Sequence, residues 1–94
     1  MQIHFFATLR QITNQKTVEF DLPDQATVRE MVELIINRFP SMRKELLDED
    51  GNLWRHVHVF VNGRDTPYLS DKMETIVQPT DTVNIFPAVG GGAL

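Results

Sequence analysis

Cysteine is absent from the 94 residues of this sequence. Its absence excludes disulfide bonds, metal centres built on thiolates and a cysteine nucleophile. No hydrophobic run approaches the ~20 residues that a membrane-spanning helix requires. No basic segment precedes the first hydrophobic residues, so a signal peptide is not expected either. We therefore predict a cytoplasmic protein with no membrane partner.

Positive charge is also scarce. Nine Lys and Arg residues are outnumbered by thirteen Asp and Glu residues, which gives a net charge of -4 with the two signs interspersed. A protein that binds nucleic acid normally displays a basic stripe, and none is visible here. We expect no nucleic-acid partner. The hydrophobic content of 41% is sufficient for the core of one small domain.

Four segments alternate between hydrophobic and polar residues, which is the pattern of β-strands. These segments span residues 3–9, 17–22, 56–61 and 81–86. The first two are joined by a short polar stretch and predict a hairpin. Asn62-Gly63 predicts a tight turn after the third segment. Residues 64–69 are expected to return as a short edge strand, because Pro67 is tolerated only at the edge of a sheet.

One main helix is predicted between the strands. Thr27 and Glu30 have the spacing of a capping box, and hydrophobic residues then recur at helical spacing as far as Phe39. Pro40 should end this helix. A second, short helix is predicted over residues 41–47. The order of hairpin, helix and further strands predicts the α+β class, with one main helix on one face of a mixed sheet of four to five strands.

The chain ends in residues 90–94, Gly-Gly-Gly-Ala-Leu, with no charged side chain after Asp81. Consecutive glycines at a chain end do not stabilise a fold, because glycine loses the most backbone entropy on ordering. They make a thin thread that can enter a channel where no side chain would fit. This ending favours a function in which a terminal carboxyl group reacts while Gly90 and Gly91 thread through an enzyme.

Three segments match the pattern of a known family. Residues 3–10 read Ile-His-Phe-Phe-Ala-Thr-Leu-Arg, and residues 83–92 read Val-Asn-Ile-Phe-Pro-Ala-Val-Gly-Gly-Gly. Together they resemble the first strand and the closing strand and tail of the ubiquitin-like sulfur carriers of the ThiS and MoaD group. Residues 47–65 resemble the longer branch that includes CysO. The resemblance implies a β-grasp domain over residues 1–87 and a flexible glycine-rich tail over residues 88–94.

The resemblance also implies a mechanism. An E1-like enzyme uses ATP to adenylate the C-terminal glycine, a sulfur donor displaces AMP, and a glycyl thiocarboxylate remains. A sulfur-accepting enzyme then takes the sulfur into a product. The carrier is a protein co-substrate and not an enzyme, and it binds no cofactor. The reacting residue is expected at Gly92, and no catalytic side chain is predicted.

Two residues follow the glycine that aligns with the reacting end of the family. While Ala93 and Leu94 remain, the Gly92 carbonyl belongs to an amide and cannot be adenylated as a carboxylate. We therefore predict a precursor that is activated by cleavage between Gly92 and Ala93. Related systems use a JAMM-type zinc metalloprotease for such trimming. The alternative is an extension with no role.

Aromatic side chains gather on the outward face of the predicted strands. Phe6, Phe60 and Phe86 share this face, and grouped aromatics on a sheet indicate a partner interface. In MoaD-type proteins, the positions similar to Phe6 and Phe86 contact enzyme partners. The alternative is ordinary burial under residues 40–54.

The three histidines, His4, His56 and His58, fall on the same outward face. In a β-grasp sheet the last strand separates His4 from the other two by roughly 10 Å, because neighbouring strands lie about 4.8 Å apart. That gap is too wide for one metal ion, so we predict no metal site. Arg64 and Asp65 are interpreted as a surface ion pair without a role.

Three functions share adenylation at the same glycine, and the sequence does not separate them. The first is a sulfur carrier for cysteine or homocysteine synthesis. The second is the small subunit of a molybdopterin synthase, against which the longer middle segment and the Ala-Leu extension argue mildly. The third is a ubiquitin-like protein modifier that is joined through Gly92 to lysines of its targets.

Overall fold

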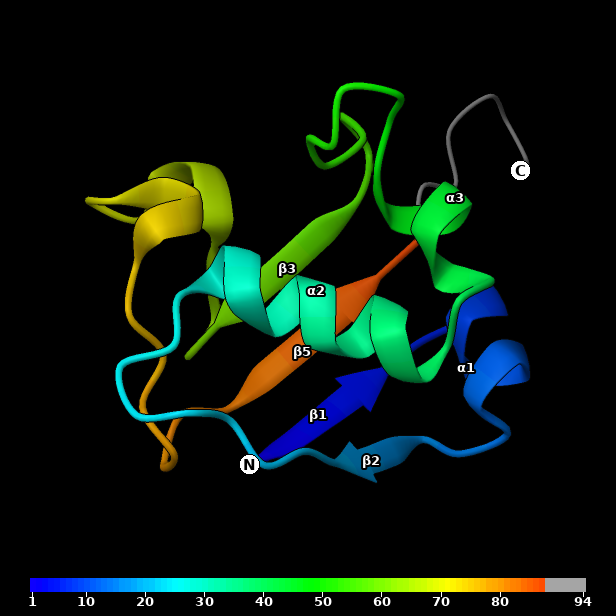
Figure 1. The fold of residues 1–94 in the computed structure, drawn as a ribbon, viewed down its shortest axis with the longest axis horizontal. Helices are drawn as coiled ribbons and strands as arrows, with labels where there is room; N and C mark the ends of the chain where they lie inside the picture. The colour runs from blue at the N-terminus through cyan, green and yellow to red at the C-terminus, as the bar shows by residue number, and fades with distance from the viewer. Residues whose placement is uncertain (88–94) are drawn as a thin grey trace.

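A mixed sheet of five strands forms one layer of the computed structural model, which describes residues 1–87 of the chain (Figure 1). The strands are β1 (Gln2–Phe5), β2 (Thr17–Glu19), β3 (His58–Val61), β4 (Arg64–Asp65) and β5 (Val83–Phe86). Their order across the sheet is β2-β1-β5-β3-β4. Strands β1 and β5 are parallel at the centre, and the other pairs are antiparallel. This topology confirms the predicted α+β class and the β-grasp arrangement that the resemblance implied.

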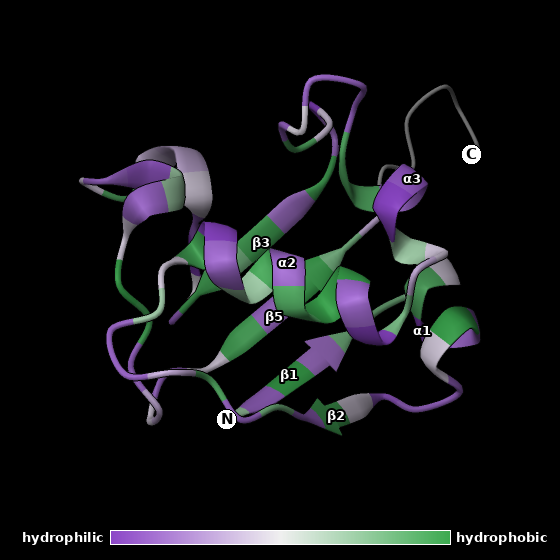
Figure 2. Ribbon diagram, in the orientation of Figure 1, coloured by the Kyte–Doolittle hydropathy of each residue, from purple (hydrophilic) through white to green (hydrophobic). Residues whose placement is uncertain are grey.

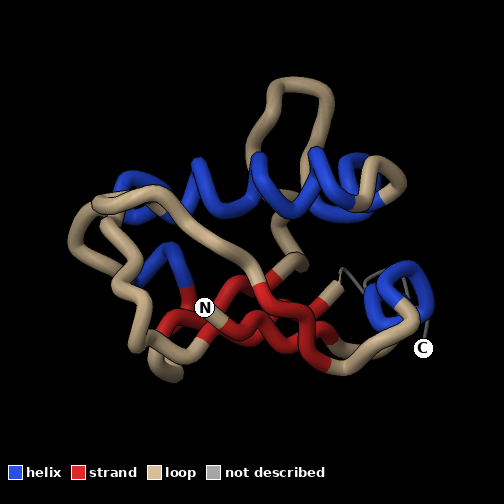
Figure 3. The backbone as a smooth tube through the Cα atoms, turned by 60° about the horizontal axis from the view of Figure 1, so that its bottom comes forward, coloured by secondary structure: helices blue, strands red, loops and turns tan. Residues whose placement is uncertain are grey.

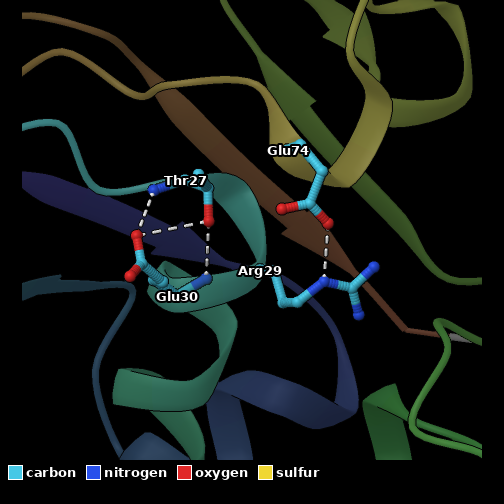
Figure 4. A network of polar contacts seen from close by, with 4 residues as sticks. All are labelled: Thr27, Arg29, Glu30 and Glu74. Carbon is cyan, nitrogen blue, oxygen red and sulfur yellow. Dashed lines mark hydrogen bonds and ion pairs between the residues drawn. The ribbon is translucent and has the colours of Figure 1, made fainter.

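The main helix, α2 (Val28–Arg38), begins at the capping box that the sequence predicted. The Thr27 hydroxyl accepts a hydrogen bond from the backbone N–H of Glu30 at 3.2 Å. The Glu30 carboxylate accepts one from the backbone N–H of Thr27 at 2.9 Å (Figure 4). In the same view Arg29 forms an ion pair with Glu74 at 2.8 Å, which links the first turn of α2 to the 3₁₀-helix η2 (Lys72–Glu74). The start of α2 is therefore fixed both locally and to a distant segment.

Helix α2 lies along one face of the sheet, and no helix within residues 1–87 lies across the opposite face (Figure 3). Hydrophobic and hydrophilic residues alternate along α2 as it crosses the sheet (Figure 2). The helix buries Val28, Met31, Val32, Ile35 and Ile36. The sheet buries Ile3, Phe5, Val18, Val59, Val83 and Ile85 against it. We call this side of the sheet the covered face and the other side the open face.

A short helix, α3 (Met42–Leu46), confirms the second predicted helix and buries Met42 and Leu46. It lies beside α1 (Thr8–Thr13), close to the end of β5 (Figure 1). Trp54 follows in the next loop and is 42% exposed, although its indole N–H donates a hydrogen bond to the Lys44 carbonyl at 2.9 Å. No helix in the described part of the chain is both long and apolar enough to cross a membrane.

The first strand is shorter than the alternation of residues 3–9 predicted, and that prediction was wrong beyond Phe5. The chain turns at Ala7, where φ is 53°, and continues as α1. Leu9 is buried as predicted, but from a helix and not from a strand. A six-residue helix offers too few positions for helical spacing to be recognised, so the last hydrophobic residue looked like a continuation of the strand.

The second half of the sheet also starts later and ends earlier than predicted. Strand β3 begins at His58, so His56 lies in the turn before it and not on the sheet. Asn62 and Gly63 have φ values of 52° and 84°, which confirms the predicted tight turn. Strand β4 has only two residues, and Pro67 lies in the 3₁₀-helix η1 (Thr66–Tyr68) and not in an extended edge strand.

Candidate functional site

The open face is aromatic at one end of the sheet and polar at the other. Where β5 ends, neighbouring strands place three rings side by side: Phe6, Phe86 and His58. The next row across the sheet contains Thr17, His4, Asn84, Phe60 and Asp65. The row beyond it is polar, with Glu19, Gln2, Thr82 and Asn62. The aromatic residues are therefore concentrated at the end from which the chain continues toward residue 88.

Phe6, Phe60 and Phe86 form one aromatic cluster. The rings of Phe6 and Phe86 stack with centroids 4.3 Å apart and an interplanar angle of 13°. Phe60 meets Phe86 edge to face at 5.6 Å. All three side chains are only partly buried. The prediction that they share the outward face is confirmed, and the alternative of full burial is not.

A hollow opens beside the cluster and is lined by Ala7, His58, Phe60, Phe86 and Pro87. We call it the aromatic hollow. Pro87 is the last described residue, so the hollow lies where the chain leaves the sheet. The predicted reacting and threading residues, Gly90, Gly91 and Gly92, and the predicted cleavage between Gly92 and Ala93 lie outside the described residues.

Arg10 borders the cluster on the side of α1. Its guanidinium carbon lies 5.7 Å from the centroid of the Phe6 ring, within the range of a cation–π interaction. Its Nε donates a hydrogen bond to the Phe5 carbonyl at 3.3 Å, which holds the side chain at the end of β1. This contact was not predicted from the sequence, because it depends on the turn at Ala7 that starts α1.

His58 and Asp65 form a second contact that the sequence did not reveal. The imidazole Nδ1 lies 2.6 Å from an Asp65 carboxylate oxygen. The predicted pairing of Arg64 with Asp65 was wrong, since successive residues of a strand point to opposite faces. Asp65 lies opposite Phe60 and is therefore diagonal to His58, within reach of a long side chain.

The histidines do not converge on one point. Strand β5 lies between β1, which carries His4, and β3, which carries His58, as predicted. The His4 Nδ1 lies 2.8 Å from the Thr17 hydroxyl, and His56 is exposed in a turn. Within residues 1–87, no group of three or more His, Asp or Glu side chains could hold a metal ion.

Comparison with known proteins then identifies the family. The model of the ThiS family matches residues 3–92, which is nearly the whole chain. The chain belongs to the ThiS family. The resemblance to ubiquitin-like sulfur carriers is thereby confirmed, and the last residue of the family match is Gly92.

Two relatives and one solved structure illustrate the breadth of this ThiS-family group. The chain is 35% identical over 92 residues to small archaeal modifier protein 3 of Haloferax volcanii, with 98% of each chain covered. It is 34% identical over 79 residues to a candidate sulfur carrier protein of Archaeoglobus fulgidus, covering 84% of this chain and 88% of the relative. A chain in the crystal structure of the BexX/CysO complex of Amycolatopsis orientalis superposes with a TM-score of 0.78, 32% identity and coverage of 97% and 98%. The relatives are modifier and sulfur carrier proteins and not enzymes.

Proposed function

We propose that this chain is a sulfur carrier that reacts through the carboxylate of Gly92. The observation that carries the proposal is the position of the aromatic cluster. It lies on the open face at the end of β5, directly before the segment that leads to Gly92. A partner enzyme that covers Phe6, Phe60 and Phe86 would therefore hold the domain with its tail directed at the enzyme's active site.

The proposed chemistry takes place at one carbonyl group. An E1-like adenylating enzyme binds ATP, and the Gly92 carboxylate attacks its α-phosphorus and releases pyrophosphate. A donor that delivers sulfur at the oxidation level of sulfide then attacks the acyl carbon, and AMP leaves with the displaced oxygen. A thiocarboxylate remains at Gly92. The carrier contributes a reactive end and a docking surface, and ATP is a substrate of the partner.

Activation requires a free carboxylate at Gly92, so we propose that the chain is made as a precursor. A metalloprotease of the JAMM type would add water across the Gly92–Ala93 amide and release the dipeptide Ala93-Leu94. The end of the ThiS-family match at Gly92 supports this assignment. Uncleaved chain would bind the adenylating enzyme but would not form an acyl-adenylate.

The sulfur acceptor is proposed to be an enzyme of cysteine or homocysteine synthesis. Similarity over nearly the whole length to a chain of the BexX/CysO complex supports a carrier that docks on a partner protein. Function as the small subunit of a molybdopterin synthase would use the same thiocarboxylate. The two functions, amino-acid synthesis and molybdopterin synthesis, differ only in the sulfur-accepting enzyme that the open face would bind.

A second candidate function is protein modification. The similarity to small archaeal modifier protein 3 favours it, because 98% of each chain is covered at 35% identity. In this case a lysine amine of a target attacks the acyl carbon of the Gly92 adenylate, AMP leaves, and an isopeptide bond forms. Both functions share the adenylation step and the open face.

Mass spectrometry of the protein isolated from its own cells tests the proposal. A chain that ends at Gly92, heavier by the mass difference between sulfur and oxygen, would mark the thiocarboxylate. Peptides of other proteins that carry a Gly92 remnant on lysine would instead mark conjugation. If every cellular form retains Ala93-Leu94 unmodified, both functions are contradicted.

A further inference from the structure

His58 differs from the other residues that line the aromatic hollow. Ala7, Phe60, Phe86 and Pro87 have side chains that cannot form hydrogen bonds, whereas His58 carries an imidazole. This ring lies beside Phe60, with centroids 5.8 Å apart and an interplanar angle of 27°. The surface of the hollow is formed by apolar atoms, and His58 is the one described lining residue whose side chain also carries hydrogen-bonding nitrogens.

The imidazole is held in one orientation by the edge strand. Its Nδ1 lies 2.6 Å from one oxygen of Asp65, whose other oxygen accepts a hydrogen bond from the Thr66 backbone N–H at 3.0 Å. The Thr66 hydroxyl donates in turn to the Val59 carbonyl at 2.7 Å, in the buried part of β3. The Asp65 side chain is 13% exposed and the His58 side chain 43% exposed. Asp65 is thus a fixed support for a ring that reaches the surface.

This support determines which nitrogen carries hydrogen. A carboxylate can only accept a hydrogen bond, so an imidazole that carries a single hydrogen places it on Nδ1 in this contact. The Nε2 atom is left as an acceptor, and no described residue bonds it. A surface contact of this kind contributes little to stability. The arrangement is therefore better explained by orientation of Nε2 than by stabilisation of the fold.

His4 provides an internal comparison on the same open face. Its Nδ1 lies 2.8 Å from the Thr17 hydroxyl, which can either donate or accept a hydrogen bond. That contact does not fix which nitrogen carries hydrogen. His4 also lies in the polar part of the open face and does not line the aromatic hollow. It serves as a matched control for His58.

We propose that His58 is a specificity-determining contact for the adenylating enzyme. Its Nε2 accepts a hydrogen bond from an N–H or O–H group that the enzyme presents beside the aromatic cluster, and Asp65 is the positioning residue that keeps Nε2 an acceptor. An enzyme surface that fits this site combines an apolar pocket for the aromatic cluster with one N–H or O–H donor for Nε2. This inference rests on the proposed function, in which the open face docks on that enzyme.

Four variants test the role of each nitrogen. His58→Asn retains an amide that can bond Asp65 but places no atom at the position of Nε2. His58→Gln extends far enough to present an amide oxygen there. Asp65→Asn keeps an oxygen for the Thr66 N–H but can donate to Nδ1, which moves the hydrogen of the ring to Nε2. His4→Asn is the control.

The measurement is pyrophosphate exchange by the purified E1-like enzyme from the same organism, with chains that end at Gly92 and therefore keep every described residue. We expect His58→Asn and Asp65→Asn to raise KM for the carrier about tenfold with kcat unchanged. His58→Gln and His4→Asn should stay within about threefold of the wild type. Thermal unfolding of each variant verifies that it is folded at the assay temperature.

The outcomes separate this inference from the proposed function. Wild-type activation with equal KM values for all four variants would overturn the role of His58 alone. A raised KM for His58→Asn with an unchanged KM for Asp65→Asn would overturn the assignment of Nε2 as an acceptor. Failure of the wild-type chain to be activated would overturn the proposed function, and the inference with it.

Discussion

The two faces of one sheet have different tasks in this molecule. On the covered face, Ile3, Phe5, Val59 and Ile85 are fully buried against α2. On the open face, Phe86 packs against Phe6 and Phe60, and all three side chains remain partly accessible. Adjacent residues such as Ile85 and Phe86 therefore belong to different environments. The covered face determines stability, and the open face is available for recognition.

The two ends of the open face also differ from each other. Aromatic residues lie at the end where β5 leads toward the tail, whereas Gln2, Thr82 and Asn62 lie at the other end. Exposed aromatic side chains are costly in water and are enriched in interface centres. Their concentration beside the exit of the chain is the basis for the proposed docking surface next to the proposed reacting end.

The largest effect is expected from Gly91→Val. The added side chain should block threading into the adenylating enzyme and lower the rate of adenylation by at least about 100-fold. The free energy of unfolding should not change. Pyrophosphate exchange and thermal unfolding measure the two quantities, and Gly91→Ala, with a smaller side chain, should give an intermediate rate. Equal activation of the Val variant and the wild type would contradict the threading role.

A substitution on the covered face should lower the stability of the fold and leave adenylation unchanged. Ile85→Ala leaves a cavity under α2 and should lower the free energy of unfolding by about 3–4 kcal/mol. Chemical denaturation gives this value. At a temperature where the variant is still folded, its KM in pyrophosphate exchange should match that of the wild type. A stable variant with weakened binding would show that Ile85 acts in recognition.

Phe86→Ala changes the neighbouring residue on the open face. It should weaken binding to the adenylating enzyme about 30-fold, as expected for an aromatic anchor at the centre of an interface. Loss of the contacts with Phe6 and Phe60 should lower the free energy of unfolding by only about 1–2 kcal/mol. Calorimetric titration and chemical denaturation test both values. Unchanged affinity together with a large loss of stability would make Phe86 a core residue.

The smallest effect is expected from Thr27→Ala. Removal of the hydroxyl that accepts the Glu30 N–H should lower the free energy of unfolding by about 1 kcal/mol. Affinity for the adenylating enzyme should not change, since α2 lies on the other side of the sheet. Thr27→Ser, which keeps the hydroxyl, is the control. A loss of stability shared by both variants would show that the capping bond is not the cause.

Local signals in the sequence were sufficient for the elements with regular patterns. The spacing of Thr27 and Glu30 predicted the start of α2, and the alternation through Val83 and Ile85 predicted β5. The turn at Asn62-Gly63 was also predictable, because both residues tolerate positive φ. The strand order came from the resemblance to a family and not from these patterns.

Other features depend on contacts between distant segments and could not be predicted in this way. Helix α1 starts at the positive φ of Ala7, which no local signal indicates. The pair of His58 and Asp65 requires the register of the β3–β4 hairpin, in which Phe60 faces Asp65. Without this register the nearest charged neighbour of Asp65 is Arg64, and the wrong pair was predicted.

The most direct measurement is ATP–pyrophosphate exchange by the cognate E1-like enzyme in the presence of two forms of this chain. One form ends at Gly92 and the other retains Ala93-Leu94. We predict exchange that depends on the shortened form and none above background with the longer form. Absence of exchange with the shortened form, while the enzyme is active with another carrier, would contradict the account.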